Sequence, residues 1–261
     1  MNILKQLSEE IFDFSKNSIT SLKTQELKGT MTKEFGSIFD LCDFVIDMHI
    51  TNPQSIKPSL IKVTLKTLSA FMSWIPLGYI FETQLMMKLI ENLLAENTFR
   101  VETIKCLTEI AGLRGPAKLE KNYEETSLMM FIKIIEKMEQ IINGVVLNEE
   151  YHKIAAKQIS GFESFCLQFG LLLSTFLQHH IDLIETTCAN PSANQEAIQV
   201  LVAKTKQSLN YILQLSEVPN DEIFKVCVEF WNFLANRVYS AVASENLTVY
   251  GQTGKSCQKQ K

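Results

Sequence analysis

The stretch WIPLGYIFET, residues 74–83, interrupts a chain whose other segments have the apolar spacing of helices. Proline lacks an amide hydrogen and disfavours helical backbone in the preceding residue, so we expect a helix to end before Pro76. Gly78 favours a turn because glycine adopts backbone angles that other residues resist. Thr83 is a good N-cap for the returning helix.

A turn this rich in large apolar side chains is expected to be buried between one helix pair and the next. We therefore interpret it as a hydrophobic plug that packs the structure, rather than as a docking site for a partner's side chain. Its members are Trp74, Pro76, Leu77, Gly78, Tyr79 and Phe81. Trp74 is expected to be buried beside the turn.

Elsewhere, apolar residues recur at steps of three and four, which is the spacing of one helix face. No segment alternates with period two over a convincing length, so the pattern predicts an all-α protein. The expected helices cover 3–15, 31–46, 60–72, 83–94, 99–113, 120–143, 149–186, 193–216 and 220–243, with a polar connection around 15–25 and a proline-containing turn at 51–58.

These helices form antiparallel pairs of about 40–50 residues, the period of HEAT or armadillo repeats. One pair cannot bury its apolar face alone, so pairs must stack into a superhelical α-solenoid. The repeats are poorly self-similar, which leaves a compact helical bundle open. We expect residues 1–244 to form the helical segment, about five pairs, and 245–261 to be an irregular polar tail. The first helix begins with an apolar stripe and no polar cap, which is typical of a piece of a longer stack.

Composition argues against several classes of protein. The net charge of −4 disfavours direct nucleic-acid binding, and the longest apolar runs are too short to insert into a membrane. Six cysteines are scattered without a CxxC pair, which indicates a reducing compartment and no zinc site.

Chemistry-bearing clusters are also weak. His179 and His180 lie near Glu185 and Cys188, but adjacent helical residues point about 100° apart and do not converge on a metal. A helix end with cationic side chains is the better interpretation of the histidines. No carboxylate has a matched base and no phosphate-binding loop occurs, so the sequence predicts no enzyme, cofactor or metal.

Several stretches resemble one protein family. WIPLGYIFET (74–83), TFRVETIKCLTEIAG (98–112), LSEEIFDFS (7–15), STFLQHH (174–180) and EIFKVCVEFWNFLA (222–235) are similar to the amino-terminal half of the exportin-1 family, within the importin-β/karyopherin superfamily. They follow the family's order and spacing over roughly residues 2–240. The segments 114–170 and 186–205 match only in helical character, and the tail from 245 resembles nothing in the family.

The resemblance implies a role in nuclear export. Such receptors are stacks of HEAT repeats that bind proteins with leucine-rich export signals together with Ran-GTP, and they shuttle between nucleus and cytoplasm. This chain would be approximately repeats four to eight, part of the arch around Ran, without the cargo groove. Ran-GTP would be a direct partner, and cargo proteins and nucleoporins would be partners through the full-length receptor. The alternative is an unrelated HEAT-type interaction scaffold in the cytosol.

On the last helix, 220–243, two faces can be separated by spacing. We expect the packing face to consist of Ile223, Cys227, Phe230, Trp231, Leu234 and Val238. The opposite polar stripe consists of Glu222, Lys225, Glu229, Asn232 and Asn236. The resemblance implies that this stripe faces Ran on the concave side, and a merely solvated helix face is the alternative.

Overall fold

A computed structural model describes residues 21–72, 75–113, 121–156, 161–192 and 194–256. Every regular element within those ranges is a helix, as the apolar spacing predicted. The helices are α2 (Ser21–Thr51), α3 (Pro58–Met72), α4 (Gly78–Phe81), α5 (Leu85–Met87), the π-helix η1 (Lys88–Leu93), α6 (Arg100–Ala111), α7 (Lys121–Ile142), α8 (Leu147–Ala156), α9 (Phe162–Ala189), α10 (Gln195–Ser216) and α11 (Asp221–Ser256).

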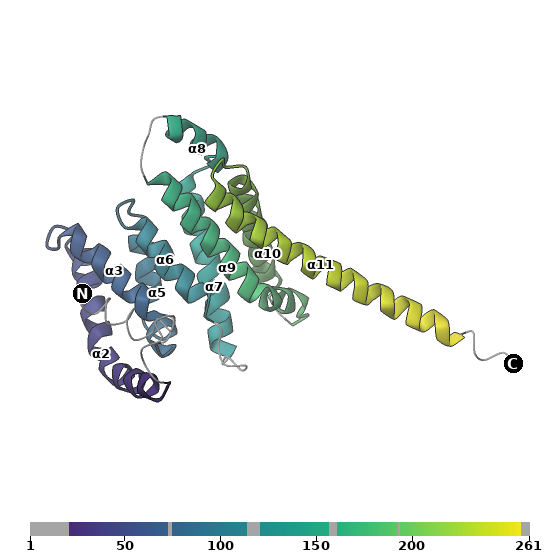
Figure 1. Cartoon of the computed structure of the whole chain (residues 1–261), viewed down its shortest axis with the longest axis horizontal. Coiled ribbons are helices and arrows are strands. Elements are labelled where there is room, and N and C mark those ends of the chain that lie inside the picture. Colours follow the sequence, from purple (N-terminus) through teal and green to yellow (C-terminus); the bar gives the residue numbers. More distant parts are fainter. Residues whose placement is uncertain (1–20, 73–74, 114–120, 157–160, 193, 257–261) are drawn as a thin grey trace.

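The helices alternate between two layers along the chain (Figure 1). One layer holds α3, α6, α9 and α11, each packed on the next, while α2, η1, α7 and α10 form the other layer. Four helix pairs result in the described part of the chain, and α8 is an extra helix between α7 and α9. This arrangement is that of an α-solenoid of HEAT type rather than a compact bundle.

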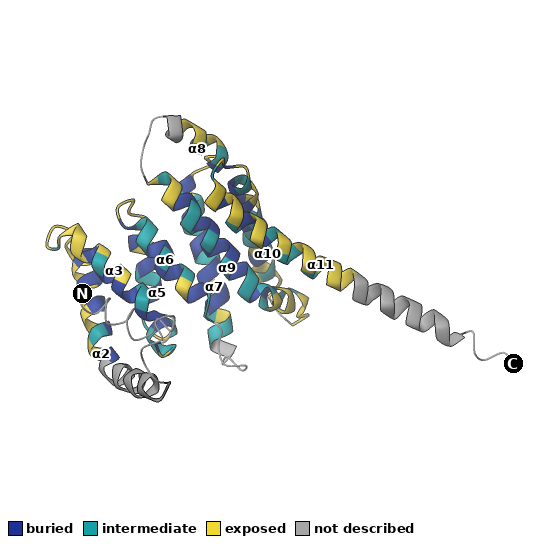
Figure 2. Ribbon diagram, viewed as in Figure 1, coloured by how far each residue is buried: buried dark blue, intermediate teal, exposed yellow. Residues whose placement is uncertain are grey.

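Aromatic side chains hold the layers together, and the buried residues lie between them (Figure 2). Phe35 of α2 meets Phe71 of α3 with ring centroids 5.7 Å apart. Phe169 of α9 meets Tyr211 of α10 at 5.4 Å, which joins neighbouring pairs. Burial of such rings supplies much of the energy that packs one pair on the next.

Two of the predicted helices differ from those in the structure, and one residue differs in its exposure. The segment 149–186, predicted as one helix, is divided into α8 and α9, and Gly161 at the junction has a left-handed φ of 106°. The helix predicted at 83–94 contains a π turn, in which the N–H of Leu94 donates to the carbonyl of Leu89. Leu60, expected on the buried side of α3, is 40% exposed because it lies in the first turn, at the edge of the stack.

Two further differences concern segments predicted to be irregular. α2 already begins at Ser21, inside the expected connection at 15–25. The expectation of an irregular tail from 245 is wrong through Ser256, because α11 continues that far. Extending a formed helix needs no new nucleus, and no proline interrupts either segment. The helix expected at 3–15 lies outside the described residues.

Candidate partner-binding surfaces

The start of α11 is fixed by a side-chain cap. The Asn220 Oδ1 atom accepts hydrogen bonds from the backbone N–H groups of Glu222 and Ile223, each at 3.1 Å. Asparagine at this position satisfies amides that have no partner within the helix. One turn on, Cys227 and Phe230 are fully buried, so the predicted packing face is correct in this half of the helix.

Two polar contacts then fix the rotation of α11 on its neighbours. The indole Nε1–H of Trp231 donates to Ser216 Oγ at the end of α10, at 2.9 Å. The Arg237 guanidinium pairs with Glu185 and Asp182 of α9, each at 2.5 Å. Hydrogen bonds to Glu185 first, and then to Asp182, raise the pKa of Arg237. Both contacts cross between helices, so they orient the exposed face of α11.

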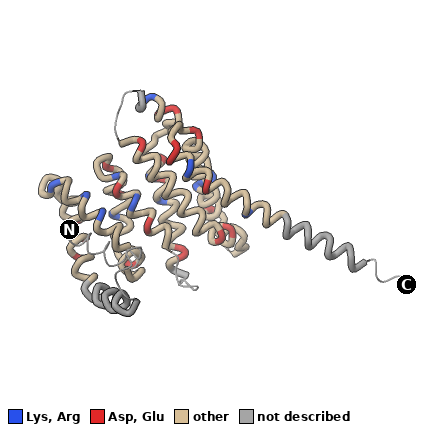
Figure 3. Tube along the Cα trace, viewed as in Figure 1, with Lys and Arg blue, Asp and Glu red and all other residues tan. Residues whose placement is uncertain are grey.

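The predicted polar stripe occupies that exposed face. All five of its residues, Glu222, Lys225, Glu229, Asn232 and Asn236, are exposed. Within it, the Asn236 amide donates to Asn232 Oδ1 at 3.3 Å. Figure 3 shows acidic and basic residues intermixed along the stack rather than separated by sign. The stripe therefore offers hydrogen bonds and both charges from one helix.

Beside this polar stripe lies a second exposed stripe, which is apolar. Val238, predicted on the packing face, is 55% exposed, so that prediction is wrong. The physical reason is that α11 projects past the helices that cover its first turns (Figure 1). Among the residues of α11 up to Val242, the other large apolar side chains that are exposed are Phe224, Val228, Tyr239 and Val242. Their helical spacing was visible in the sequence, but spacing alone cannot tell whether a neighbouring helix covers a stripe.

The plug makes contacts on both sides. The Tyr79 ring meets Phe35 and Phe39 of α2 at centroid distances of 5.1 and 4.9 Å, and Phe81 stacks on Tyr123 of α7 at 5.1 Å. The turn thus contacts a helix from the pair before it and a helix from the pair after it.

The other plug residues differ in their surroundings. Leu77 is half-buried and Pro76 is exposed, while Trp74 lies outside the described residues. Gly78 begins the short helix α4 and has no positive φ, so the expectation that glycine is needed for the turn is wrong. The expectation that Thr83 is the N-cap of the returning helix is wrong, because Gln84 holds that position and makes no side-chain cap. Thr83 lies one residue earlier, where its Oγ1 accepts the N–H of Leu85 at 3.2 Å.

The two adjacent histidines bond in different directions. His179 Nδ1 contacts the carbonyl of Thr175 at 2.8 Å, and His180 Nε2 contacts that of Ala111 at 3.0 Å. α9 continues to Ala189, so their interpretation as a helix end is wrong. In the described part of the chain, no three His, Cys, Asp or Glu side chains gather as metal ligands. Nor does any helix there have the length and apolar character needed to cross a membrane.

Comparison with known proteins gives a consistent result. A family model described as Exportin 1-like protein matches residues 1–107, and one described as chromosome region maintenance or exportin repeat matches residues 205–239. Exportin-1 of Drosophila melanogaster is 39% identical over 241 residues, and Exportin-1 of Schizosaccharomyces pombe is 35% identical over 239. Protein EXPORTIN 1A of Arabidopsis thaliana is 33% identical over 242 residues.

Each of these alignments covers 92% of this chain but 20% of the relative. The chain therefore spans about a fifth of the length of the curated relatives that it matches. The shorter of the two family matches falls on the second half of α10 and the first half of α11, which includes the polar stripe.

Proposed function

Because the chain belongs to the exportin-1 family, we propose that it forms a segment of a nuclear export receptor. Such a receptor would carry proteins with leucine-rich signals from nucleus to cytoplasm together with Ran-GTP, and it would meet nucleoporins on the way. This segment, residues 1–244 in approximately repeats four to eight, would be part of the arch around Ran. The cargo groove would lie elsewhere in the receptor.

The observation that supports this proposal is that the likeness runs through the whole helical stack rather than through a single repeat. A stack of pairs can couple two distant partners through small rotations between repeats. Each partner then changes the other's affinity by the same factor. The segment would act by binding and by transmitting these rotations, without catalysis.

Within the segment, we assign Ran contact to the polar stripe of α11. α11 is the second helix of its pair and lies in the layer with α3, α6 and α9. Its exposed face is oriented by the Asn220 cap, the Trp231 hydrogen bond and the Arg237 ion pairs. Because this face is already held in place in the free protein, binding a partner would order the side chains of the stripe itself and little else. The plug is proposed as a packing joint between pairs, not as a contact for a partner.

The test is a titration of the purified chain with Ran loaded with GTP and, separately, with GDP, at low salt. We expect binding of the GTP form alone. Reversing charges in the stripe, with Lys225→Glu and Glu229→Lys together, should weaken that binding at least tenfold. Glu125→Lys, an exposed change on α7 in the other layer, is the control and should leave it unchanged.

Three results would count against the proposal. Equal binding of both nucleotide forms would remove the nucleotide dependence expected of an export receptor. Unchanged binding by the stripe variant would leave the stripe as a solvated helix face. A chain that binds neither form would place Ran contact outside this segment. The unrelated cytosolic scaffold is not favoured, because it does not explain the family matches at both ends of the stack.

A further inference from the structure

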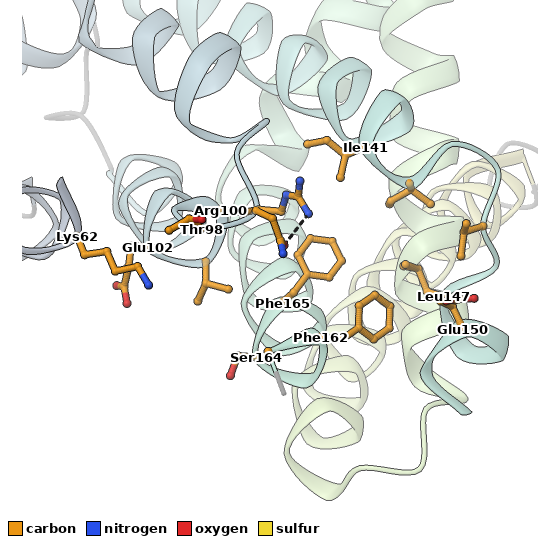
Figure 4. Close-up of a pocket in the computed structure, with 15 residues that line it drawn as sticks. Lys62, Thr98, Arg100, Glu102, Ile141, Leu147, Glu150, Phe162, Ser164 and Phe165 are labelled. Atoms are coloured by element: carbon orange, nitrogen blue, oxygen red, sulfur yellow. Dashed lines mark hydrogen bonds between the residues drawn. The ribbon is translucent and has the colours of Figure 1, made fainter. Parts of the chain in front are cut away.

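A pocket of about 750 Å³ lies where the ends of four helices meet (Figure 4). The first turns of α6, α8 and α9 and the last turn of α7 surround it, and Lys62 of α3 lies at its edge as a second cation besides Arg100. This volume is within the range of about 300–1,000 Å³ that is typical of small-molecule sites. It is separate from the polar stripe of α11, none of whose residues lines it.

One side of this interhelical pocket is apolar. Phe162 and Phe165 of α9 face Leu147 of α8, with Ile141 of α7 above them (Figure 4). Val145, in the turn after α7, is 41% exposed and lies at the rim. A flat aromatic or branched aliphatic group would therefore find apolar contacts on several sides.

Arg100 provides the polar side. Its guanidinium lies over the Phe165 ring, 5.9 Å from the centroid. Three of its five N–H groups donate to neutral oxygens, namely the carbonyls of Leu94 and Ala95 and the side chain of Asn97. Burial lowers the pKa of Arg100, but an arginine remains protonated at neutral pH. Among the described residues, no carboxylate forms an ion pair with it.

The two acidic residues that line the pocket are already paired. Glu102 contacts Lys66 at 3.9 Å and Lys105 at 3.5 Å, and Glu150 contacts Lys153 at 3.6 Å. These lysines offset the two carboxylates, so the charge of Arg100 is not cancelled within the pocket.

The N-terminus of α9 adds to this positive potential. Gly161, just before the helix, has no side chain to act as a cap, and the first intrahelical bond is donated by the N–H of Phe165 to the carbonyl of Gly161. The earlier amides of a helix point outward and favour an anion. Gly161, Phe162 and Ser164 of this turn line the pocket.

We propose that the interhelical pocket binds an organic carboxylate with a compact apolar body. The carboxylate would accept hydrogen bonds from the remaining N–H groups of Arg100, and the apolar body would lie between Phe162 and Leu147. A free aromatic acid and the carboxyl-terminal residue of a peptide share this chemistry.

The first experiment compares three probes by isothermal titration calorimetry on the whole chain. They are 4-phenylbutyrate, the peptide acetyl-Gly-Phe as free acid, and the same peptide as carboxamide. We expect saturable binding of at least one acid, and binding of the amide at least tenfold weaker than that of its matched acid. Tighter binding of the peptide acid would identify a peptide terminus as the source, and tighter binding of phenylbutyrate would identify a free acid. Equal binding of acid and amide, or no saturable binding by either acid, would overturn the proposal.

Variants locate the binding. Arg100→Gln should weaken binding of the acid at least tenfold, but it also removes the hydrogen bonds to the carbonyls of Leu94 and Ala95. Val145→Glu leaves those hydrogen bonds intact and places a negative charge at the rim of the pocket. It should therefore weaken binding of the acid by a similar factor. Val228→Glu, the same change at a 44% exposed position on α11, is the matched control. If both valine variants lost acid binding equally while their circular dichroism stayed unchanged, the acid would not bind in the interhelical pocket.

Discussion

At the scale of single residues, Phe131 of α7 and Phe176 of α9 form a stacked aromatic contact between the layers. Their ring centroids are 4.4 Å apart with an interplanar angle of 4°, and each ring is 1% exposed. Phe131→Ala would leave a cavity that rigid helices on both sides cannot fill. We expect a loss of about 3–5 kcal/mol in the free energy of unfolding, measured from urea denaturation.

Met129 on the same helix is the matched control, because its side chain is 46% exposed. Met129→Ala should stay within about 0.5 kcal/mol of the original chain. Equal shifts of the two denaturation midpoints would mean that the stacked rings add nothing beyond helix propensity.

The buried thiols predict how stability depends on pH. Burial raises the pKa of Cys42 and of Cys166 from 9.0 to about 12, and it also raises that of Cys106. In the unfolded chain these thiols ionise near pH 9, whereas in the fold they remain protonated. Their contribution is therefore full below pH 9 and is lost as the pH rises toward 12. Between pH 9 and 10 we expect a loss of about 1 kcal/mol per thiol.

Urea denaturation at pH 8, 9 and 10 measures this loss, before most lysines titrate. The variant with both Cys42→Ala and Cys166→Ala should be less stable at pH 8, because two buried sulfur atoms are removed. Its further loss between pH 9 and 10 should be smaller than that of the original chain by about 2 kcal/mol. Parallel pH profiles for the two proteins would show that the thiols do not control the dependence.

At the scale of elements, α9 begins directly after a glycine with a left-handed backbone. Gly161 has a φ of 106°, and an added Cβ atom would meet nothing within 4 Å. The cost of Gly161→Ala is therefore one of backbone conformation, about 1–2 kcal/mol. Gly78→Ala is the matched change at a helical φ, where the nearest atom is the Glu82 carboxylate at 3.4 Å. It should be neutral or stabilising by up to about 1 kcal/mol. The thermal unfolding temperature of Gly161→Ala should fall, whereas that of Gly78→Ala should stay the same or rise. Equal destabilisation of the two variants would contradict this account.

These two glycines also show what the sequence can and cannot predict. Apolar spacing located α3, α6, α7 and α10 within a few residues, because each has one continuous buried face. It joined α8 to α9, because one glycine between two apolar patterns is a weak signal when its φ is unknown. The turn expected at Gly78 was wrong for a similar reason, because a glycine in the sequence does not reveal its φ, and Gly78 begins α4 without a positive φ.

The candidate surfaces were predictable to a similar degree. The polar stripe of α11 follows from spacing, since every member is exposed. The apolar stripe beside it does not, because burial of Val238 depends on how far the neighbouring helices extend. The interhelical pocket was not predicted either. It is formed by ends of helices that are distant in sequence, and no local pattern reports where such ends converge.

At the scale of the whole molecule, the stack has consequences that a compact bundle would not have. Each helix pair contacts mainly its neighbours, and in the described part of the chain the buried cluster runs from Phe35 in α2 to Phe230 in α11 by way of the pairs between them. Exposed apolar residues at both ends, such as Phe44 on α2 at 60% and Phe224 on α11 at 52%, are consistent with an open stack. Local stability should then vary along the chain, with the terminal pairs opening most easily.

Hydrogen exchange measured by mass spectrometry tests this expectation with one substitution at each end. Phe35 in α2 and Phe230 in α11 are both fully buried, so Phe35→Ala and Phe230→Ala remove equal side chains from opposite terminal pairs. We expect Phe35→Ala to raise exchange in α2 and α3, and Phe230→Ala to raise it in α10 and α11. In each variant the far pair should retain its protection, because stability in a stack adds from neighbour to neighbour. Exchange raised equally in all helices by either substitution would instead indicate one cooperative core, and rotations between pairs would then not be available to couple distant partners.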